Sequence, residues 1–395
     1  MSRLRGAGAL AACVLAGAWL VGSTALAVMG VGLALAAVAV GAWRRLVVQG
    51  LSVERRPLDG APVEGEPLAI EAQVHGRRRL CGSLVWEESL GGLGLRAAPV
   101  STDGRAHVVF DAVPRGRHRL DRGRLLAGDP LGLGRAVVEV ETLSFVTVRP
   151  RVPELQTLFT ESGTWGDGGR RAFVRRTSGL EPHGVREYVE GEPLRAVHWP
   201  TSARRGELMV RELEDAPRES IAVVLDVDAG AVAGPRGDSS LDDAVRAAAG
   251  LVRAHALRSR RVLLVVAAPE PVLQRVRGIG PDWELALDAL AAAEPARGTA
   301  LRELIAPQSV IGGVPELVVV TGRPEVVADA LVARAAIGRS SALVSVDAPT
   351  YAGRPPAGAS PTLLRLAGAG VAVAVLRHGM SLPDALGGLR ARAVG

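Results

Sequence analysis

Near its N-terminus the chain carries a long apolar run, with no charged residue between Arg5 and Arg44. A helix needs about 20 apolar residues to cross a bilayer, so the run is long enough for two short spans with a turn at residues 22–24. Arginines flank both ends, and the positive-inside rule then places both ends in the cytoplasm. We expect residues 1–47 to form a two-helix transmembrane hairpin, with both termini and the soluble domains on the cytoplasmic side of the cell membrane.

A cleaved secretory signal is the alternative for this run. Ala9–Val21 has the length of a signal core, and Ala25-Leu26-Ala27 resembles a cleavage site. However, the apolar sequence continues to Arg44, whereas a cleaved signal normally leads into polar sequence. Even after cleavage, Met29–Trp43 would remain as a short anchor. We therefore favour the uncleaved hairpin.

The next hundred residues have a pattern typical of strands. Apolar and polar positions alternate over Pro67–Val74, which predicts a half-buried strand. Further short strands follow, separated by Gly, Pro and Asp turns; they are expected at Leu80–Trp86, Ala106–Val113, Arg117–Leu125, Ala136–Val140 and Leu143–Val148. We expect residues 48–150 to form a β-sandwich-like domain. Residues 151–220 are expected to be a connector.

From Ile221 onward the period changes. Continuous apolar runs predict buried strands at Ile221–Val227, Val262–Ala267, Leu317–Thr321, Leu343–Val346 and Val371–Leu376. Helical patterns lie between and after them, at Leu241–Ser259, Asp282–Ala293, Glu325–Ala336, Pro361–Ala369 and Leu382–Arg392. Strands that alternate with helices indicate a parallel sheet covered on both faces. We expect residues 221–395 to form a doubly wound α/β domain, so the fold class is α/β plus all-β.

Charge and cysteine content narrow the function only slightly. The formal net charge is +6 and the pI about 10.5, which could favour nucleic acid or anionic lipid. The chain contains no lysine and few aromatic residues, so a compositional habit explains the arginines better than a nucleic-acid site. Cys13 and Cys81 lie in different parts of the chain, which argues against a disulfide framework. We expect the lipid bilayer as a partner and no nucleic acid.

The segment Arg186–Glu214 is dense in arginine and glutamate and leads directly into the first buried strand. Arginine binds carboxylates through two parallel hydrogen bonds, so such a segment can pair with itself or hold an acidic partner. Exposed ion pairs are common and weak, and a solvated loop therefore remains an equal alternative.

The spacing in this segment resembles the signature of domain-of-unknown-function family 58. The matching residues are Arg186, Glu187, Tyr188, Gly191, Glu192, Arg195, Val197, Trp199, Ser202, Ala203, Arg204, Leu208, Val210, Arg211 and Glu212. Pro193, His198 and Pro200 depart from the pattern. The resemblance implies a bacterial membrane protein with a von Willebrand factor A-like domain. It also implies a MoxR-type AAA+ ATPase as partner, in envelope or stress maintenance, with the signature as the partner-binding segment.

Asp226 and Asp228 are the weak candidates for a metal site. They follow the first strand of the α/β domain, where open sheets bind ligands. A von Willebrand factor A site carries one carboxylate and two hydroxyls there, which suit Mg²⁺, whereas Asp228 and Gly230 replace the hydroxyls here. Two carboxylates could still hold a hydrated ion, and a divalent-metal-dependent ligand-binding domain is thus one alternative function. Otherwise Asp226 caps the sheet edge or pairs with a signature arginine, and no metal or cofactor is expected.

Catalytic motifs are absent from the sequence. There is no G-x-S-x-G, no H-E-x-x-H and no Walker loop. Cys81 is more consistent with a small core residue than with a nucleophile, and His198 with an interface residue than with an acid or base. An uncharacterised hydrolase remains an alternative. We expect no enzyme, but a membrane-anchored adaptor that binds protein partners.

Overall fold

The computed structural model describes residues 2–58, 60–120, 122–130, 132, 134–140, 144–160, 184–187, 199–212, 220–299, 301–306, 308–309, 311–358 and 360–387. The chain divides into two compact units, Met1–Arg149 and Pro150–Gly395. Each unit has its own hydrophobic core. The finer, four-part division expected from the sequence stays a prediction.

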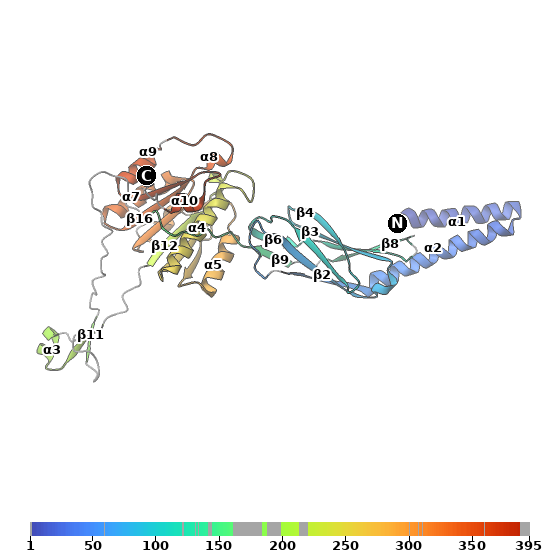
Figure 1. The fold of residues 1–395 in the computed structure, drawn as a ribbon, viewed down its shortest axis with the longest axis horizontal. Coiled ribbons are helices and arrows are strands. Elements are labelled where there is room, and N and C mark those ends of the chain that lie inside the picture. Colours follow the sequence, from blue (N-terminus) through green and yellow to red (C-terminus); the bar gives the residue numbers. More distant parts are fainter. Residues whose placement is uncertain are drawn as a thin grey trace, which may run out of the picture. The chain divides into compact units, whose positions relative to one another are not determined.

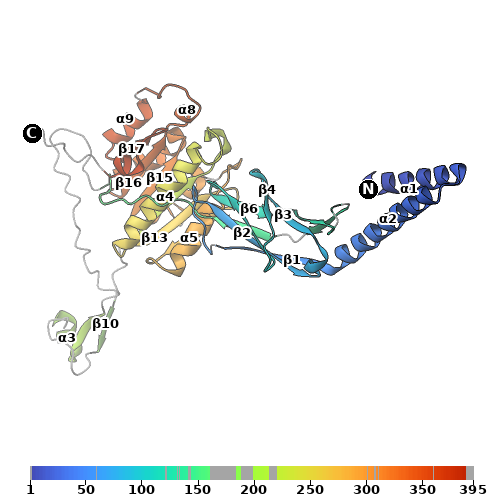
Figure 2. The ribbon, with the colours of Figure 1, turned by 45° about the vertical axis from the view of Figure 1, so that its right-hand side comes forward.

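The first unit begins with two helices, α1 (Ser2–Val21) and α2 (Thr24–Gly50). They lie side by side in both views of the ribbon (Figures 1 and 2). The contact is close, because a Cβ added at Gly30 of α2 would lie 2.6 Å from Cγ of Leu15 in α1. Among the described residues, α2 is the helix that is long and apolar enough to cross a membrane, whereas the apolar part of α1 is shorter, Gly8–Val21. The two-span hairpin remains a prediction.

The strands of the first unit form two antiparallel sheets. They are β1 (Leu51–Pro57), β2 (Leu68–Gly76), β3 (Ser83–Leu90), β4 (Gly94–Pro99), β5 (Arg105–Phe110), β6 (Gly116–Leu120), β7 (Gly123–Gly128), β8 (Arg135–Val140) and β9 (Ser144–Val148). One sheet has the order β1-β2-β5, and the other has the order β8-β7-β3-β6-β9, with β4 paired to β3. The expectation of a strand-rich region is confirmed.

One hydrophobic core joins the two sheets. The alternating residues Leu68, Ile70, Ala72 and Val74 of β2 are at most 1% exposed, as the period of two predicts. Trp86 of β3 is fully buried in the same core, and so is Val47 from the last turns of α2. The core therefore includes the end of α2 as well as both sheets.

Two strands of this unit, β1 and β4, are absent from the sequence-based prediction. The single strand expected at Arg117–Leu125 is also wrong, since it comprises β6 and β7 with a turn between them. The sequence of β1, L-S-V-E-R-R-P, is polar at most positions and lacks a regular apolar alternation. It is a strand because β2 pairs with it along its full length and because Arg55 finds a buried partner.

That partner is Glu88 of β3. Arg55 Nη1 lies 2.8 Å from Glu88 Oε1, and the two side chains are 2% and 0% exposed. Trp86 Nε1–H donates to the second carboxylate oxygen at 3.2 Å. Burial raises the pKa of Glu88, although Arg55 favours the ionised carboxylate. The pair is fully sealed inside the β core.

The second unit contains a six-stranded sheet with the order β14-β13-β12-β15-β16-β17. Its strands are β12 (Ser220–Asp226), β13 (Arg261–Ala267), β14 (Val272–Val276), β15 (Glu316–Thr321), β16 (Ser340–Val346) and β17 (Ala372–Leu376). Its helices are α4 (Ser240–Leu257), α5 (Pro281–Ala291), α6 (Leu301–Leu304), α7 (Pro324–Ala336), α8 (Ala348–Tyr351), α9 (Pro361–Gly368) and α10 (Leu382–Leu386). All pairs are parallel except β13 with β14.

Helices cover both faces of this sheet. Core residues of α4, α5 and α10 pack on one face, and those of α6, α7 and α9 on the other. Both-sided burial explains why the parallel strands are continuous apolar runs. The mixed α/β architecture is thus confirmed. The antiparallel edge strand β14 is missing from the prediction, because its sequence V-L-Q-R-V is short and half-polar.

Residues just after the unit boundary also belong to this core. Leu158 is fully buried and Phe159 is 7% exposed in the cluster under α4. The Phe159 N–H donates to Leu386 O at 2.7 Å. The sequence assigns this stretch to a connector, but the structure docks it on the α/β unit because its apolar side chains find cover there.

Candidate functional site

The strand order creates a switch point in the α/β sheet. From β12 the chain goes to β13 on one side, and β15 is followed by β16 on the other side. The connections after the neighbouring strands β12 and β15 therefore diverge, and open α/β sheets bind ligands at such a place. Asp226 ends β12 and Thr321 ends β15. The first candidate site is the group of side chains at these two strand ends.

One arginine joins the two carboxylates that the sequence singled out. Arg323 Nη2 lies 3.4 Å from Asp226 Oδ2, and its Nη1 lies 3.1 Å from Asp228 Oδ2. The hydroxyl of Thr321 donates to Asp226 Oδ2 at 2.7 Å. Thr299 adds a second hydroxyl, 3.4 Å from Asp228 Oδ2. The Arg323 guanidinium thus lies between both acids at the switch point.

The burial of these groups decreases outward. The side chain of Asp226 is 1% exposed, that of Asp228 is 16% exposed and that of Arg323 is 27% exposed. A buried carboxylate needs a counter-charge or a metal, and here the guanidinium supplies the charge. Among the described residues the partner of Asp226 is Arg323, which lies outside the signature. The signal in the sequence is that Gly322-Arg323 directly follows the predicted strand Leu317–Thr321.

The oxygen atoms at these strand ends are a poor match for a metal ion. Mg²⁺ prefers several carboxylate, carbonyl or water oxygens in octahedral geometry. Within the described residues, no group of three or more His, Cys, Asp or Glu side chains could hold an ion. Asp226 and Asp228 supply two carboxylates, both of which already contact Arg323. The two carboxylates are therefore better suited to pairing with the Arg323 guanidinium than to binding a metal ion.

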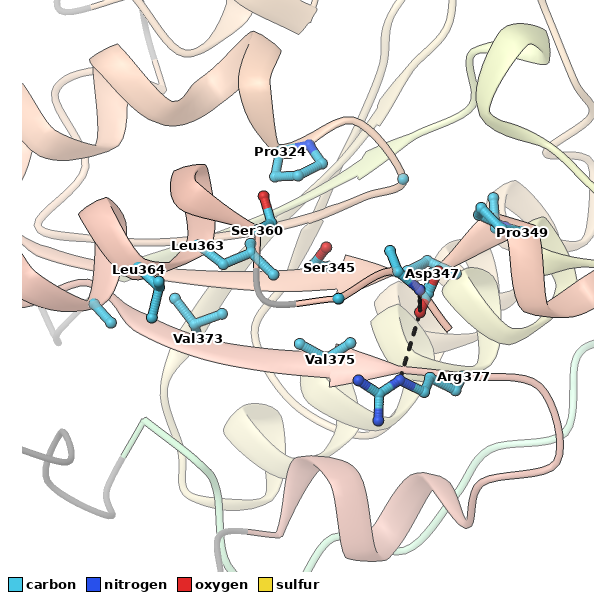
Figure 3. Close-up of a pocket in the computed structure, with 16 residues that line it drawn as sticks. Pro324, Ser345, Asp347, Pro349, Ser360, Leu363, Leu364, Val373, Val375 and Arg377 are labelled. Carbon is cyan, nitrogen blue, oxygen red and sulfur yellow. Dashed lines mark hydrogen bonds and ion pairs between the residues drawn. The ribbon is translucent and has the colours of Figure 1, made fainter. Parts of the chain in front are cut away.

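A cavity lies farther along the same edge, at the carboxyl ends of β16 and β17 (Figure 3). Its volume is about 620 Å³, within the range of small-molecule sites. Apolar side chains from α9 and β17 line one part of it, including Leu363, Leu364, Val373 and Val375. Asp347 and Arg377 lie together at its polar end, as Figure 3 shows.

Asp347 is only partly satisfied in this cavity. Its Oδ2 lies 3.4 Å from Arg377 Nε and accepts from the Ala357 N–H at 3.2 Å. Its Oδ1 is buried and has no hydrogen-bond partner. A buried acceptor without a partner is costly, so this end of the cavity favours a group that donates a hydrogen bond. No sequence motif marks these residues.

Tyr351 and His378 are close in sequence to Pro349 and Arg377, which line this cavity. The Tyr351 hydroxyl donates to Asp243 Oδ2 at 2.6 Å, and His378 Nε2 lies 2.9 Å from Asp238 Oδ2. The two rings are 5.2 Å apart between centroids. Burial, with the hydrogen bond to Asp243 next in size, raises the pKa of Tyr351 far above its usual value. The phenol therefore stays protonated and ties α8 to α4, which suits a structural role.

Parts of the arginine-rich signature form a small element of their own. Strand β10 (Gly184–Glu187) pairs antiparallel with β11 (Met209–Glu212), so Arg186 lies opposite Val210. Helix α3 (Trp199–Arg205) precedes β11. Ser202 is buried and accepts from the Met209 N–H at 2.8 Å, which fixes α3 to the start of β11.

This element leaves several signature side chains at the surface. Trp199 is 62% exposed, and Ala203, Arg204 and Arg205 are exposed as well. The β10–β11 pairing places Arg186 opposite Val210 and Glu187 opposite Met209, whereas Arg211 and Glu212 lie opposite Val185 and Gly184. Tyr188, Gly191, Glu192, Arg195 and His198 lie outside the described residues. Their roles stay predictions.

Cys81 sits apart from the sites above. It is half-buried near the start of β3, and burial raises the pKa of its thiol. A raised pKa keeps the sulfur protonated at neutral pH, which disfavours a nucleophile. His118 contacts the Pro114 carbonyl at 2.7 Å and His107 contacts Glu71 at 3.2 Å.

Residues 184–306 match the family model described as "Protein of unknown function DUF58". The match starts at β10 and extends through β12, α4 and α5. It therefore includes the signature element, Asp226 and Asp228, but it ends before Arg323 and the cavity.

Two further similarities were found. The "Uncharacterized protein YeaD" of Bacillus subtilis (strain 168) is 27% identical over 114 residues, which is 29% of this chain and 29% of that protein. The chain thus aligns with less than a third of its relative's length. The solution structure of the PKD domain from human VPS10 domain-containing receptor SorCS2 is 16% identical, with a TM-score of 0.18, over 26% of this chain and 76% of that domain. A TM-score this low supports no argument.

Proposed function

We propose that the chain is a membrane-anchored adaptor that binds a protein partner through its signature element. The observation that carries the proposal is the surface of α3, where the 62% exposed Trp199 stands on the same short helix as exposed Arg204 and Arg205. Tryptophan and arginine are the residue types that dominate binding energy at protein interfaces. A large exposed indole gains little from water, so it favours a partner that covers it.

The partner should be acidic where it meets α3. Neither Arg204 nor Arg205 has an ion-pair partner within the described residues, although both lie in the last turn of α3. Two exposed guanidinium groups on the same helix as an exposed indole match a carboxylate-bearing, partly apolar surface. The family resemblance adds the identity: a MoxR-type AAA+ ATPase, in envelope or stress maintenance.

The anchor in this proposal is the pair α1 and α2. Helix α2 is long and apolar enough to cross a membrane. The close contact between Gly30 and Leu15 suits helix packing in lipid, where small residues let backbones approach. Arg3 and Arg5 precede the apolar part of α1, and Arg44 and Arg45 follow the apolar part of α2. Both helices would span the membrane, with the sheets of the first unit and the whole second unit on the cytoplasmic side.

The test is crosslinking of the full chain in native membranes, followed by identification of what is bound. We expect an ATPase with a P-loop to be captured by the wild type and to be lost from Trp199→Ala and Arg204→Glu. Truncating an indole at the centre of an interface costs about 2 kcal/mol or more in binding, or about 30-fold in affinity.

Arg302→Glu is the matched control for the charge reversal. Arg302 is exposed on α6 in the same unit, away from α3 in sequence, and it has no ion-pair partner among the described residues. The control should capture the ATPase as the wild type does. Equal capture by all four proteins, with unchanged thermal unfolding, would contradict the proposal.

A further inference from the structure

Helix α2 extends beyond the part of it that suits a membrane. The apolar stretch from Thr24 to Trp43 rises about 30 Å, the thickness of a hydrocarbon core. Arg44 and Arg45 follow, and the helix then continues to Gly50. Tryptophan and arginine at this point mark the level of the lipid head groups. Trp43 therefore marks the depth of the membrane interface, and residues of the first unit that contact Trp43 lie at the same depth.

The part of the first unit that contains strands β1 to β9, called the β unit from here on, touches α2 at that level. Trp43 Nε1–H donates to the Leu80 carbonyl at 2.6 Å. One turn of helix nearer the membrane, Val40 is 7% exposed, and a Cβ added at Gly134 would lie 2.4 Å from its side chain. The base of the β unit is thus held against α2 at the height of Trp43 and slightly below it.

A short 3₁₀ helix, Arg78–Leu80, forms most of this base. The Arg77 N–H donates to the Gly50 carbonyl at 3.1 Å, and Leu80 bonds to Trp43 as above. Residues 77–80 therefore run back along α2, from its end toward the apolar part. Arg77, Arg79 and Leu80 are exposed, and Leu80 is 41% so. An exposed leucine beside exposed arginines at the depth of the head groups suits the membrane–water interface, because the leucine can contact acyl chains while the arginines contact phosphates.

The cations of this surface are Arg44, Arg45, Arg77 and Arg79. The described residues provide no ion-pair partner for any of them. The neighbouring acids are already engaged. Asp103 contacts Arg105 at 3.6 Å, and Glu54 contacts His75 at 3.9 Å. Asp129 accepts a hydrogen bond from the Gly134 N–H. Arg44 and Arg45 thus follow Trp43 on α2, and Arg77 and Arg79 precede Leu80, which Trp43 contacts; none of the four has a counter-charge among the described residues.

We propose that Arg44, Arg45, Arg77 and Arg79 form a binding site for the phosphate groups of anionic phospholipids, with Trp43 and Leu80 seated among the adjoining acyl chains. Charge complementarity at the level set by Trp43 supports lipid as the occupant. The site rests on the membrane anchor proposed above, but not on the adaptor role. Its consequence is that the β unit is itself attached to the membrane surface.

The test uses the full chain in micelles that contain equal amounts of phosphatidylglycerol and phosphatidylcholine, with retained lipids counted by native mass spectrometry. We expect the wild type to retain phosphatidylglycerol preferentially. Each arginine near an anionic surface contributes about fivefold in affinity, so Arg77→Gln with Arg79→Gln should weaken that retention about 30-fold. Both residues are exposed, so the double variant should fold.

The matched control is Arg96→Gln with Arg122→Gln, which removes the same charge. Both arginines are exposed. The base lies at the start of β3 and the end of β7, where Ser83 pairs with Gly128. Arg96 pairs with Glu88 near the end of β3, and Arg122 directly precedes β7, so both lie away from the base. This control should retain lipid as the wild type does. Equal loss in both double variants would overturn the site, because the attraction would then be only a matter of net charge. Equal binding of free glycerol phosphate by the wild type would also overturn it.

Alkaline carbonate extraction of native membranes separates this inference from the anchor. Wild type and both double variants should stay in the membrane pellet. If the wild type is extracted, the anchor fails and the lipid site fails with it. If all stay in the pellet while the Arg77/Arg79 variant keeps its phosphatidylglycerol, the lipid site alone is wrong.

Discussion

The two units hold an arginine and a carboxylate in opposite settings. In the β unit, Arg55 and Glu88 are 2% and 0% exposed and lie in the middle of strands. In the α/β unit, Arg323 is 27% exposed and contacts Asp226 and Asp228 at the ends of strands. The first pair is reached only by unfolding, whereas the second lies where such sheets bind ligands. Position within the strand, rather than the chemistry of the pair, separates a structural contact from a candidate site.

The largest effect should come from breaking the sealed pair. Arg55→Ala leaves Glu88 charged, buried and without a counter-ion, which costs about 3–5 kcal/mol of unfolding free energy. The measurement is calorimetric unfolding of the full chain in detergent. Arg55→Met combined with Glu88→Leu is the control, and it should recover most of the loss because an apolar pair needs no solvation. If Arg55→Ala lowers the unfolding free energy by less than about 1 kcal/mol, the value typical of an exposed ion pair, the contact is not shielded from solvent.

A smaller effect is expected at the switch point. Arg323→Ala removes the charged donor of Asp226 and should cost about 1–3 kcal/mol. It also frees two carboxylates and the hydroxyls of Thr299 and Thr321, a set of oxygens that suits Mg²⁺ or Mn²⁺. Millimolar Mg²⁺ should therefore raise the unfolding temperature of this variant but not of the wild type.

Arg323→Ala with Asp226→Asn is the control for that gain, and it should not respond to the ion. An equal rise of the unfolding temperature of the wild type with Mg²⁺ would contradict the interpretation that the Arg323 guanidinium takes the place of a metal ion. It would instead favour the metal-dependent alternative.

The smallest effect is one of pH. Burial raises the pKa of Glu88 above 4.5, so the folded protein keeps this proton where the unfolded chain has lost it. The stability from Glu88 is then full below about pH 4.5 and declines as the pH rises through the folded pKa. Glu88→Gln should remove this decline in a pH series of unfolding temperatures.

Glu71, in the same unit, should give a pH dependence of stability in the opposite direction. The hydrogen bond from Arg56 lowers the pKa of Glu71, with further contributions from Arg105 and His107. Its stabilisation is therefore present above about pH 4.5 and is lost as the pH falls through the folded pKa. Glu71→Gln should remove an acid-side loss. The same slope change in both variants would contradict the assignment of the two shifts.

Much of the fold could be predicted because buried positions recur along the sequence with the period of the strand or helix that they belong to. The continuous apolar runs that became β12, β13 and β15 require helices on both faces, and the alternation in β2 requires one buried face. The polar strand β1 escaped this reasoning, since its arginine is satisfied by Glu88, 33 residues away. Periodicity describes a local pattern, whereas such a pair exists only after two sheets have met.

The same limit applies to the sites. Asp226 and Asp228 could be selected because they follow a predicted strand, but their partner Arg323 lies 97 residues from Asp226. Only the strand order, with β15 beside β12, brings the two together. The cavity at Asp347 and Arg377 left no sequence signal for a related reason, because its walls come from α9, β16 and β17 together.

The unbroken course of α2 has a mechanical consequence. The helix passes without a linker into β1, and its residue Val47 is locked inside the β core. In the membrane anchor proposed above, a change in the tilt of α2 would rotate the attached sheets with it. A change in bilayer thickness, to which a spanning helix can respond by tilting, would thereby reach the β unit.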